Sequence, residues 1–229
     1  MRVLSVNNAK AEAEWQELPS PKVEKGEIRI QVEAAGLNRA DLLQIKGLYP
    51  GKVDNPILGL ECSGIIDQIG EGIDEAWIGR KVCALLRGGG IADYVVCSPS
   101  VVVSAPSGIE LSLAAGLCET WCTALFNLWD QAKLVPKERV LIHAGASGVG
   151  VAAIQLARLL GATPFITCGS EKKLQYCLDR GAEAGVVRTQ DWAAYFRGLG
   201  LQFDVILDPV GAGYLNKDLS VAANTARIA

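Results

Sequence analysis

The sequence has little histidine, little net charge and no long apolar segment. Its 229 residues include one histidine, His143, so a catalytic metal site built from several histidines is excluded by count. The formal net charge of −3 leaves no global basic field that would draw the protein to nucleic acid. No apolar run approaches the roughly 20 residues that span a bilayer, and residues 1–15 lack the apolar centre of a secretion signal. We therefore expect a cytoplasmic protein that binds neither membranes nor nucleic acid.

The cysteines are too scattered to define a disulfide framework or a metal site. There are seven, and an odd number with irregular spacing is typical of reduced thiols in a cytosolic protein. Cys118 and Cys122 lie one helical turn apart, a spacing that two metal ligands can use. Zinc motifs, however, usually need two close pairs or added histidines. The cysteines are therefore interpreted mostly as small core residues, and no bound metal is expected.

The composition is that of a folded globular protein, because 50% of the residues are hydrophobic and 21% are charged. The first half of the chain predicts β-structure broken by turns such as Tyr49-Pro50-Gly51 and Gly88-Gly89-Gly90. Short antiparallel strands of this kind suggest a barrel-like β domain. The predicted strands are Ile28–Ala34, Cys62–Ile69, Lys81–Leu86 and Tyr94–Cys97.

The second half changes to an alternation of buried strands and amphipathic helices, which predicts parallel βαβ units with right-handed crossovers. The predicted strands are Val140–His143, Pro164–Cys168, Gly185–Val187 and Phe203–Asp208, and the predicted helices are Gly148–Leu160, Glu171–Arg180, Trp192–Gly198 and Gly213–Ala223. A further helix, Leu111–Leu128, is expected to lead from one domain into the other. We place residues 1–112 in the first domain and residues 113–229 in the second.

The strongest motif joins a buried strand to a helix through a glycine-rich turn, Val140-Leu-Ile-His-Ala-Gly145-Ala-Ser-Gly148-Val-Gly150. This context separates a dinucleotide fingerprint from a chance run of glycines. We expect Gly145 to permit the tight turn, Gly148 to let the helix N-terminus face the ligand closely, and Gly150 to allow close helix–strand packing. The amides and positive end of the helix then attract a pyrophosphate. An ordinary glycine-rich entry to a helix is the alternative.

Ser147 stands where the usual fingerprint has its second glycine. Its hydroxyl either bonds the cofactor or only caps the helix. The candidate phosphate-binding residues are Gly145, Ala146, Ser147, Gly148, Val149 and Gly150.

The tip of the next strand indicates which dinucleotide binds. A site that prefers NAD has an acidic side chain there, which bonds the ribose 2′-hydroxyl. Here the tip carries Gly169 and Ser170, and Lys173 follows one helical turn later. A nearby cation and no carboxylate at the tip favour the 2′-phosphate of NADP(H). Glu171 is interpreted as serving the helix dipole, and the alternative for the lysine is a solvated helix face.

Several motifs together resemble one enzyme family. They are Gly36-Leu-Asn38-Arg39-Ala40-Asp41, Gly47-Leu48-Tyr49-Pro50, Leu58-Gly59-Leu60-Glu61-Cys62-Ser63-Gly64, Gly88-Gly89-Gly90-Ile91-Ala92-Asp93-Tyr94, Trp121-Cys122-Thr123-Ala124, the glycine-rich turn and Gly169-Ser170-Glu171-Lys172-Lys173-Leu174. With them the whole chain resembles the medium-chain dehydrogenase/reductase superfamily, in its quinone oxidoreductase (zeta-crystallin) branch. The motifs are specific to the branch and less specific to the substrate.

The resemblance implies an α/β protein: a chaperonin-10-like (GroES-like) β-barrel substrate domain, followed by an incomplete Rossmann domain, a doubly wound parallel sheet, for NADPH. Zinc-dependent members use a cysteine and a Gly-His-Glu motif, where this sequence has Asn38 and Gly59-Leu60-Glu61. The resemblance therefore implies no zinc. The expected reaction is zinc-independent hydride transfer from NADPH to a quinone, for which the protein supplies proximity and orientation.

The resemblance also implies roles for single residues. It places Asn38 and Tyr49 near the nicotinamide or the substrate, as candidate catalytic residues, and Thr123 at the nicotinamide end. The alternatives are that Asn38 is only a turn residue, that Tyr49 is only a partly buried aromatic side chain, and that Thr123 is only a threonine on a helix surface. Arg188 stands where many members have a tyrosine near the adenosine ribose, and it either pairs with the 2′-phosphate or faces water.

The family continues beyond position 229, so the chain is expected to be truncated at its C-terminus. Arg227-Ile228-Ala229 then forms the first half of a strand, after about four Rossmann strands of the usual six. Full-length members are expected to be homodimers, which is doubtful for this chain. Two functions remain open beside quinone reduction: reduction of enoyl or alkenal (conjugated carbonyl) substrates, and an inactive, truncated cofactor-binding or structural protein.

Overall fold

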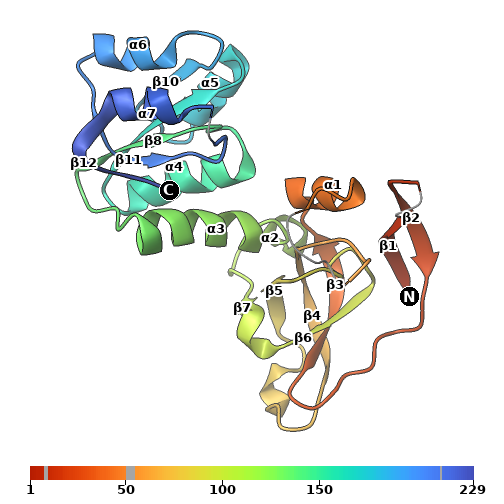
Figure 1. Cartoon of the computed structure of the whole chain (residues 1–229). Helices are drawn as coiled ribbons and strands as arrows, with labels where there is room; N and C mark the ends of the chain where they lie inside the picture. The colour runs from red at the N-terminus through yellow and green to blue at the C-terminus, as the bar shows by residue number, and fades with distance from the viewer. Residues whose placement is uncertain (8–9, 50–54, 212) are drawn as a thin grey trace. The chain divides into compact units, whose positions relative to one another are not determined.

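The computed structural model describes residues 1–7, 10–49, 55–211 and 213–229. Pro50 and Gly51 of the expected turn lie outside these ranges. The chain divides into two compact units, Met1–Glu119 and Thr120–Ala229 (Figure 1). No helix in the described ranges is long and apolar enough to cross a membrane.

The N-terminal unit is built on antiparallel strands. Its larger sheet has the order β6-β3-β4-β5-β7, and β1 and β2 form a separate hairpin. The strands are β1 (Arg2–Asn7), β2 (Glu12–Glu17), β3 (Ile28–Ala35), β4 (Glu61–Ile69), β5 (Lys81–Leu85), β6 (Tyr94–Cys97) and β7 (Val102–Ser104). The helical segments are α1 (Arg39–Ile45), η1 (Glu75–Trp77), η2 (Pro99–Val101) and α2 (Leu111–Ala114).

The core of this unit follows the two-residue period of its strands. Ile28 and Ile30 point to one face of β3 and are fully buried, together with Ile66 of β4. Arg29, between the two isoleucines, points to the other face and forms a bidentate pair with Asp67, with N–O distances of 3.0 and 2.8 Å. The predicted strands of this half are therefore confirmed to within one residue at each end.

The expected continuous helix 111–128 is wrong. The segment forms α2, then α3 (Cys118–Leu125) and the π-helical turn η3 (Phe126–Gln131). The Ala114 carbonyl accepts from the Leu117 N–H at 3.2 Å, three residues along, and from the Cys83 thiol at 3.4 Å. The last turn of α2 is thus tightened, and Gly116, a poor helix former, follows it.

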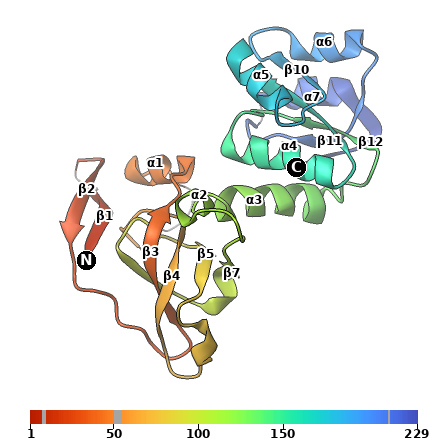
Figure 2. The ribbon, with the colours of Figure 1, turned by 180° about the vertical axis from the view of Figure 1, so that it is seen from behind.

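The C-terminal unit is a parallel sheet with the strand order β10-β9-β8-β11-β12. This order corresponds to 3-2-1-4-5 of the Rossmann fold. The strands are β8 (Arg139–Ile142), β9 (Thr163–Cys168), β10 (Ala184–Val187), β11 (Phe203–Leu207) and β12 (Ala222–Ile228). The helices after α3 are α4 (Gly148–Leu159), α5 (Glu171–Leu178), α6 (Trp192–Gly198) and α7 (Leu215–Val221). Figure 2 labels the strands β10, β11 and β12 and the helices α4, α5, α6 and α7 of this unit.

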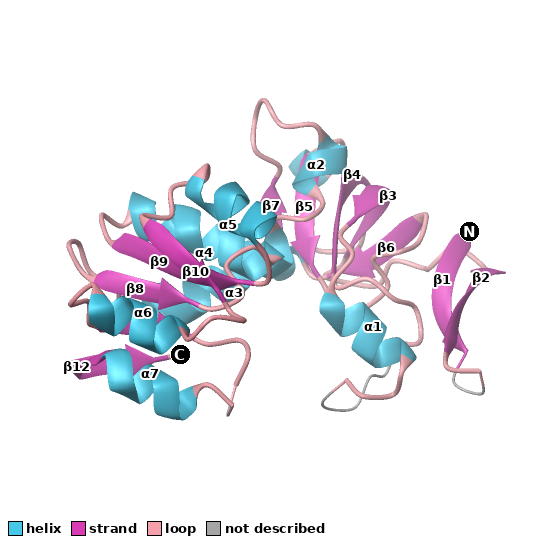
Figure 3. Ribbon diagram, turned by 90° about the horizontal axis from the view of Figure 1, so that it is seen from above, coloured by secondary structure: helices cyan, strands magenta, loops and turns pink. Residues whose placement is uncertain are grey.

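Helices cover both faces of this sheet, which makes it doubly wound (Figure 3). Val140 and Ile142 of β8 belong to the core cluster that includes residues of α4 and α5. Leu141, between them, belongs to the cluster that includes residues of α6 and α7. A strand whose successive side chains are all buried is what a sheet covered on both faces requires, and the predicted βαβ alternation is confirmed.

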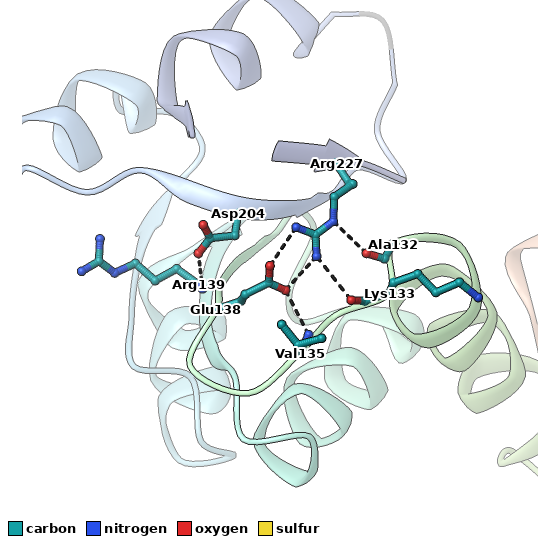
Figure 4. A network of polar contacts seen from close by, with 7 residues as sticks. All are labelled: Ala132, Lys133, Val135, Glu138, Arg139, Asp204 and Arg227. Atoms are coloured by element: carbon teal, nitrogen blue, oxygen red, sulfur yellow. Dashed lines mark hydrogen bonds and ion pairs between the residues drawn. The ribbon is translucent and has the colours of Figure 1, made fainter. Parts of the chain in front are cut away.

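The last strand is longer than the sequence indicated. β12 begins at Ala222, not at Arg227, and pairs in parallel with β11. Arg227 fastens it to the segment before β8: its guanidinium donates to both carboxylate oxygens of Glu138, at 2.8 and 2.7 Å, and to the Ala132 carbonyl at 2.8 Å (Figure 4). These contacts lie near the end of β12 and join that end of the strand to the segment before β8.

Candidate cofactor site

The turn between β8 and α4 is fixed by short backbone bonds. Gly145 donates its N–H to the Thr167 carbonyl at 2.9 Å, and Ser147 donates its N–H to the Ala144 carbonyl at 2.8 Å. The Ser147 side chain accepts from the Gly150 N–H at 3.0 Å and is the N-cap of α4. The capping role considered for the Ser147 hydroxyl is therefore observed, and its proton stays available to a ligand.

The three glycines of the turn are needed for close packing. A Cβ at Gly145 would lie 2.7 Å from the Ile166 Cβ, and one at Gly148 would lie 2.8 Å from the Thr120 Cγ2. A Cβ at Gly150 would lie 2.6 Å from two carbonyl oxygens of the turn itself. Real Cβ atoms do not approach this closely, so none of the three positions admits a side chain without movement.

These contacts correct the role expected for Gly145 and add a packing reason for Gly148, whose expected approach to a ligand stays a prediction. The residue with left-handed backbone geometry in the turn is Ala144, with φ of 51°, whereas Gly145 instead allows β9 to pack closely. The close neighbour that requires a glycine at position 148 is the Thr120 side chain. Sequence reasoning could not separate these roles, because each depends on which part of the fold lies against the turn.

A pocket of about 270 Å³ opens at the carboxyl ends of β8, β9, β10 and β11. It is lined by Ala144, Ala146, Ser147, Thr167, Cys168, Gly169, Lys173, Arg188, Val210 and Tyr214. The structure thus brings together five of the predicted residues: Ala146, Ser147, Gly169, Lys173 and Arg188. The carboxyl edge of a doubly wound sheet is where such folds bind their ligands.

Two cationic side chains line this pocket, and none of its described lining residues is acidic. Lys173 lies in the first turn of α5, where the Ser170 hydroxyl caps its backbone N–H at 3.4 Å. Arg188 follows β10, and its N–H donates to the Cys168 carbonyl at 2.7 Å. Both residues are exposed. Burial raises the pKa of the Cys168 thiol, so this lining group is neutral near physiological pH.

The first turn of α4 supplies further donors. Gly148 and Val149 are the first two residues of the helix, whose N–H groups have no acceptor within the helix. The positive end of the helix dipole lies at the same place. The turn, the helix end and the two cations together suit a ligand with several phosphate groups.

A buried polar cluster behind this turn was missed from the sequence. His143 is fully buried, with its Nδ1 2.8 Å from the Thr167 Oγ1 and its Nε2 2.8 Å from Asp218 Oδ1. Its ring makes edge contacts with Trp192 and Tyr214, at centroid distances of 4.8 Å in both cases. A histidine directly before the glycine turn was the available signal, but its partners lie far along the chain.

The candidate catalytic residues belong to the N-terminal unit. Asn38 precedes α1; its N–H donates to the Asp41 carboxylate at 2.7 Å, and its side-chain amide donates to Glu61 Oε1 at 2.8 Å. Tyr49 is half-buried in the segment that follows α1. Thr123, on α3 of the other unit, is half-buried, is not among the residues that line the pocket, and accepts from the Asn127 amide at 2.8 Å through its carbonyl.

A group of carboxylates surrounds Asn38. Glu61 is buried, and its Oε2 accepts from the Glu119 N–H at 2.9 Å. Asp41 is also buried and accepts from the Gly59 N–H at 3.0 Å. Burial, and then the charges of Glu61 and Asp41, raise the pKa of the Glu119 carboxyl. Glu119 therefore holds a proton at a higher pH than an ordinary glutamate, which sequence reasoning did not indicate.

The residues at the expected position of a catalytic zinc do not fit a metal. Zinc prefers cysteine and histidine ligands, which Asn38 and Gly59-Leu60-Glu61 do not supply, and both carboxylate oxygens of Glu61 already accept hydrogen bonds. Within the described ranges no three His, Cys, Asp or Glu side chains are grouped to hold a metal ion. No step of the chemistry proposed below passes through zinc.

A GroES-like unit followed by a Rossmann-like parallel sheet defines the class of this protein, and comparison with known proteins agrees. Residues 24–107 match the family model "Alcohol dehydrogenase GroES-like domain", and residues 148–229 match the model "Zinc-binding dehydrogenase". CurK enoyl reductase has a similar crystal structure, with a TM-score of 0.90 and 32% identity over 99% of this chain and 72% of that chain. The chain therefore belongs to the medium-chain dehydrogenase/reductase superfamily.

Two further relatives show the breadth of this superfamily. Escherichia coli quinone oxidoreductase, solved as a complex with NADPH, has a TM-score of 0.89 and 26% identity over 99% of this chain and 71% of that chain. The synaptic vesicle membrane protein VAT-1 homolog of Danio rerio is 32% identical over 200 residues, or 86% of this chain. This chain spans only 41% of that protein.

Proposed function

We propose that this chain is the cofactor-binding and substrate-binding part of a zinc-independent, NADPH-dependent quinone reductase. The observation that carries the proposal is the pocket at the carboxyl edge of the parallel sheet, where the glycine turn meets Lys173 and Arg188. The motifs also resemble the quinone oxidoreductase branch, and within it the tumour-suppressor-inducible NADPH quinone oxidoreductases.

The residues of this pocket fit a dinucleotide phosphate. The N–H groups of Gly148 and Val149 and the Ser147 hydroxyl are suited to bond the pyrophosphate. Lys173 and Arg188 are suited to flank a 2′-phosphate, because a dianion gains most from two cations in a partly closed site. The bound nicotinamide supplies a hydride, and the protein positions it.

In this proposal Asn38 and Tyr49 act on the reacting end. Tyr49 orients the substrate carbonyl or shields the nicotinamide ring, and the Asn38 side-chain oxygen remains able to accept a bond while its amide donates to Glu61. A quinone accepts hydride directly and its reduced form spreads the negative charge, so protein groups need only orient the reactants.

The cofactor proposal is tested by titrating the purified chain with NADPH and NADH, using cofactor fluorescence. Removing either cation, in Lys173→Ala or Arg188→Ala, should weaken NADPH binding about tenfold or more, because each loses a charge-assisted bond to phosphate. NADH binding should change little. Lys172→Ala is the matched control, since this neighbouring lysine does not line the pocket. Equal NADH and NADPH affinity in the unchanged protein would contradict the 2′-phosphate site.

A second candidate function is enoyl reduction, which the similarity to CurK enoyl reductase favours. Reduction of a quinone and reduction of a conjugated carbonyl substrate both require an electrophilic carbon to be held against the nicotinamide. Steady-state turnover of a quinone, an alkenal and an enoyl thioester on one enzyme preparation distinguishes them by kcat/KM. Binding of NADPH without turnover of any of the three would favour the third possibility, a cofactor-binding protein without activity.

A further inference from the structure

The buried cluster of His143, Asp218 and Thr167 has no part in the function proposed so far. His143 and Asp218 are both 0% exposed, and Thr167 is 1% exposed. Burying a carboxylate and an imidazole beside the aromatic rings of Trp192 and Tyr214 opposes folding unless they bond each other well. Asp218 Oδ2 nevertheless has no described hydrogen-bond partner in the structure. Apolar side chains in place of the whole cluster would avoid this cost, whereas a change at position 218 alone would leave the buried His143 Nε2–H without its acceptor. These polar groups therefore call for a role beyond stability.

The chemistry of the three side chains fixes their arrangement. An ionised Asp218 only accepts, so the His143 Nε2 carries a proton and donates to it. In a neutral imidazole the Nδ1 then has a lone pair, and the Thr167 hydroxyl donates to it. In a charged imidazole the Nδ1–H donates to Thr167 instead. The ring is therefore held at both nitrogens in either state.

The hydrogen-bonded ring of His143 lies directly beside the phosphate-binding turn in the sequence. His143 immediately precedes Ala144, whose φ of 51° is unfavourable for a residue with a Cβ and must be held by its surroundings. On the other side of Ala144, the Gly145 N–H donates to the carbonyl of Thr167, the residue that bonds the His143 ring. The strained residue is thus held on both sides by bonds to Thr167, and His143 is also fixed by its backbone N–H, which donates to the Leu207 carbonyl at 3.0 Å.

The same cluster reaches the pocket wall. Thr167 and Tyr214 line the pocket, and Tyr214 directly precedes α7, the helix that carries Asp218. The Asp218 N–H donates to the Tyr214 carbonyl at 2.9 Å. Asp218 therefore joins α7, the His143 ring and the end of β9 into one hydrogen-bonded support behind the turn.

We propose that His143 and Asp218 are positioning residues for pyrophosphate binding: they hold Ala144 and Gly145 in the geometry that presents the N-terminus of α4 to the ligand. This inference rests on the proposed dinucleotide function. The 2′-phosphate end of the same pocket, at Lys173 and Arg188, does not depend on this support.

The experiment uses two fragments of the cofactor and compares their dissociation constants by isothermal titration. ADP contains the pyrophosphate, and 2′-AMP contains the 2′-phosphate without a pyrophosphate. The variants are Asp218→Asn, which keeps the shape of the side chain and removes its charge, and Thr167→Val, which removes the hydroxyl that bonds His143. Asp191→Asn is the matched control, because it removes an exposed carboxylate that pairs with Lys217 of α7, next to Asp218, and leaves the buried bonds to His143 unchanged.

Loss of the support should weaken ADP binding about tenfold or more in Asp218→Asn and Thr167→Val, as expected when hydrogen bonds to a charged ligand lose their alignment. Binding of 2′-AMP should stay within about twofold, and Asp191→Asn should match the unchanged protein for both fragments. Unchanged ADP binding in both variants would overturn the proposal. An equal loss for ADP and 2′-AMP would also overturn it, because it would mean general damage to the domain.

A second measurement separates this inference from the proposed function. If the unchanged protein binds neither fragment, the dinucleotide function fails, but amide hydrogen exchange of the unliganded protein still tests the support. The Gly145 N–H should exchange at least about tenfold faster in Asp218→Asn, because the bond that holds the His143 ring, two residues before this amide, is weakened. Unchanged protection of this amide overturns the proposal whatever binds. If Asp218→Asn does not fold, Thr167→Val gives the same two readouts.

Discussion

Replacement of Arg227 by methionine should destabilise the C-terminal unit and leave its fold unchanged. The guanidinium makes four hydrogen bonds: two to the Glu138 carboxylate and one each to the Ala132 and Lys133 carbonyls, at 2.7 to 3.4 Å (Figure 4). Methionine keeps much of the apolar stem and removes all four. Among the described residues, the partly buried Glu138 then keeps only the Val135 N–H as a hydrogen-bond partner.

The size of the effect follows from burial. The Glu138 side chain is 17% exposed and that of Arg227 is 34% exposed. A hydrogen bond to a charged group contributes about 1.5–3 kcal/mol when well shielded, whereas an exposed ion pair contributes less than about 1 kcal/mol. Arg227 is exposed enough for water to screen it, so we expect a loss of about 2–3 kcal/mol in total. For a chain of this size that lowers Tm by roughly 5–10 °C.

The loss should depend on pH in a definite direction. The Arg227 guanidinium, bonded to Glu138, holds the pKa of that carboxyl below its ordinary value of 4.5. A carboxyl whose pKa is lower in the folded state stabilises the fold above the unfolded-state pKa, and this contribution disappears as the pH falls through the folded-state pKa. The difference between the two proteins should be full at neutral pH and should shrink below 4.5.

The assay is thermal and urea unfolding of the unchanged protein, Arg227→Met, Glu138→Gln and the double variant. A double-mutant cycle isolates the coupling between the two side chains. Lys25→Met removes an ion pair whose side chains are 73% and 76% exposed, and it should have no measurable effect. The reasoning is refuted if Arg227→Met and Lys25→Met have equal effects, or if the difference grows as the pH falls.

Two further predictions concern packing and burial. Gly150→Ala should lower the free energy of unfolding by about 1–3 kcal/mol and weaken dinucleotide binding, because the new Cβ collides with backbone oxygens of the turn. Gly198→Ala is the control, since nothing lies within 4 Å of a Cβ at that position. Equal melting temperatures for the two variants would show that the turn can move. Burial raises the pKa of the Cys62 thiol to about 12, so a thiol-specific disulfide reagent at about pH 8 should label exposed Cys122 first and Cys62 only on unfolding. Mass spectrometry identifies the labelled cysteines, and rapid labelling of Cys62 in the folded protein would contradict its burial.

The elements that the sequence predicted best are those whose pattern is set by burial. β8 was recognised because Val140, Leu141 and Ile142 are all apolar, as a strand covered on both faces must be. The glycine turn was recognised because Gly145, Gly148 and Gly150 are each required by a close neighbour that a Cβ would collide with, which fixes their spacing in the sequence. By contrast, the β1–β2 hairpin was not predicted, because β2 (Glu12–Glu17) is mostly exposed and carries little apolar alternation.

Long-range contacts account for the other failures. The break after α2 combines a local signal, Gly116, with a distant contact: the thiol of Cys83, 31 residues earlier in the chain, bonds the Ala114 carbonyl. The role of His143 depends on Thr167 and Asp218, 24 and 75 residues later. No local pattern of residues contains such partners, so the sequence showed a lone histidine where the fold has a hydrogen-bonded support.

The environment of Asn38 affects how any variant at this position is interpreted. Its amide and the Glu119 N–H occupy one oxygen each of the buried Glu61 carboxylate. Asn38→Ala would leave the buried Glu61 Oε1 without the Asn38 amide as its donor, and we expect this to lower the free energy of unfolding by about 1–3 kcal/mol. Asn38→Asp would place a second negative charge against Glu61 and raise the pKa of one of the two carboxyls. A loss of turnover in either variant would therefore combine damage to the fold with loss of the proposed contact to the substrate. Only a fall in kcat/KM that remains when the variant is shown to be folded at the assay temperature would assign Asn38 a part in the reaction.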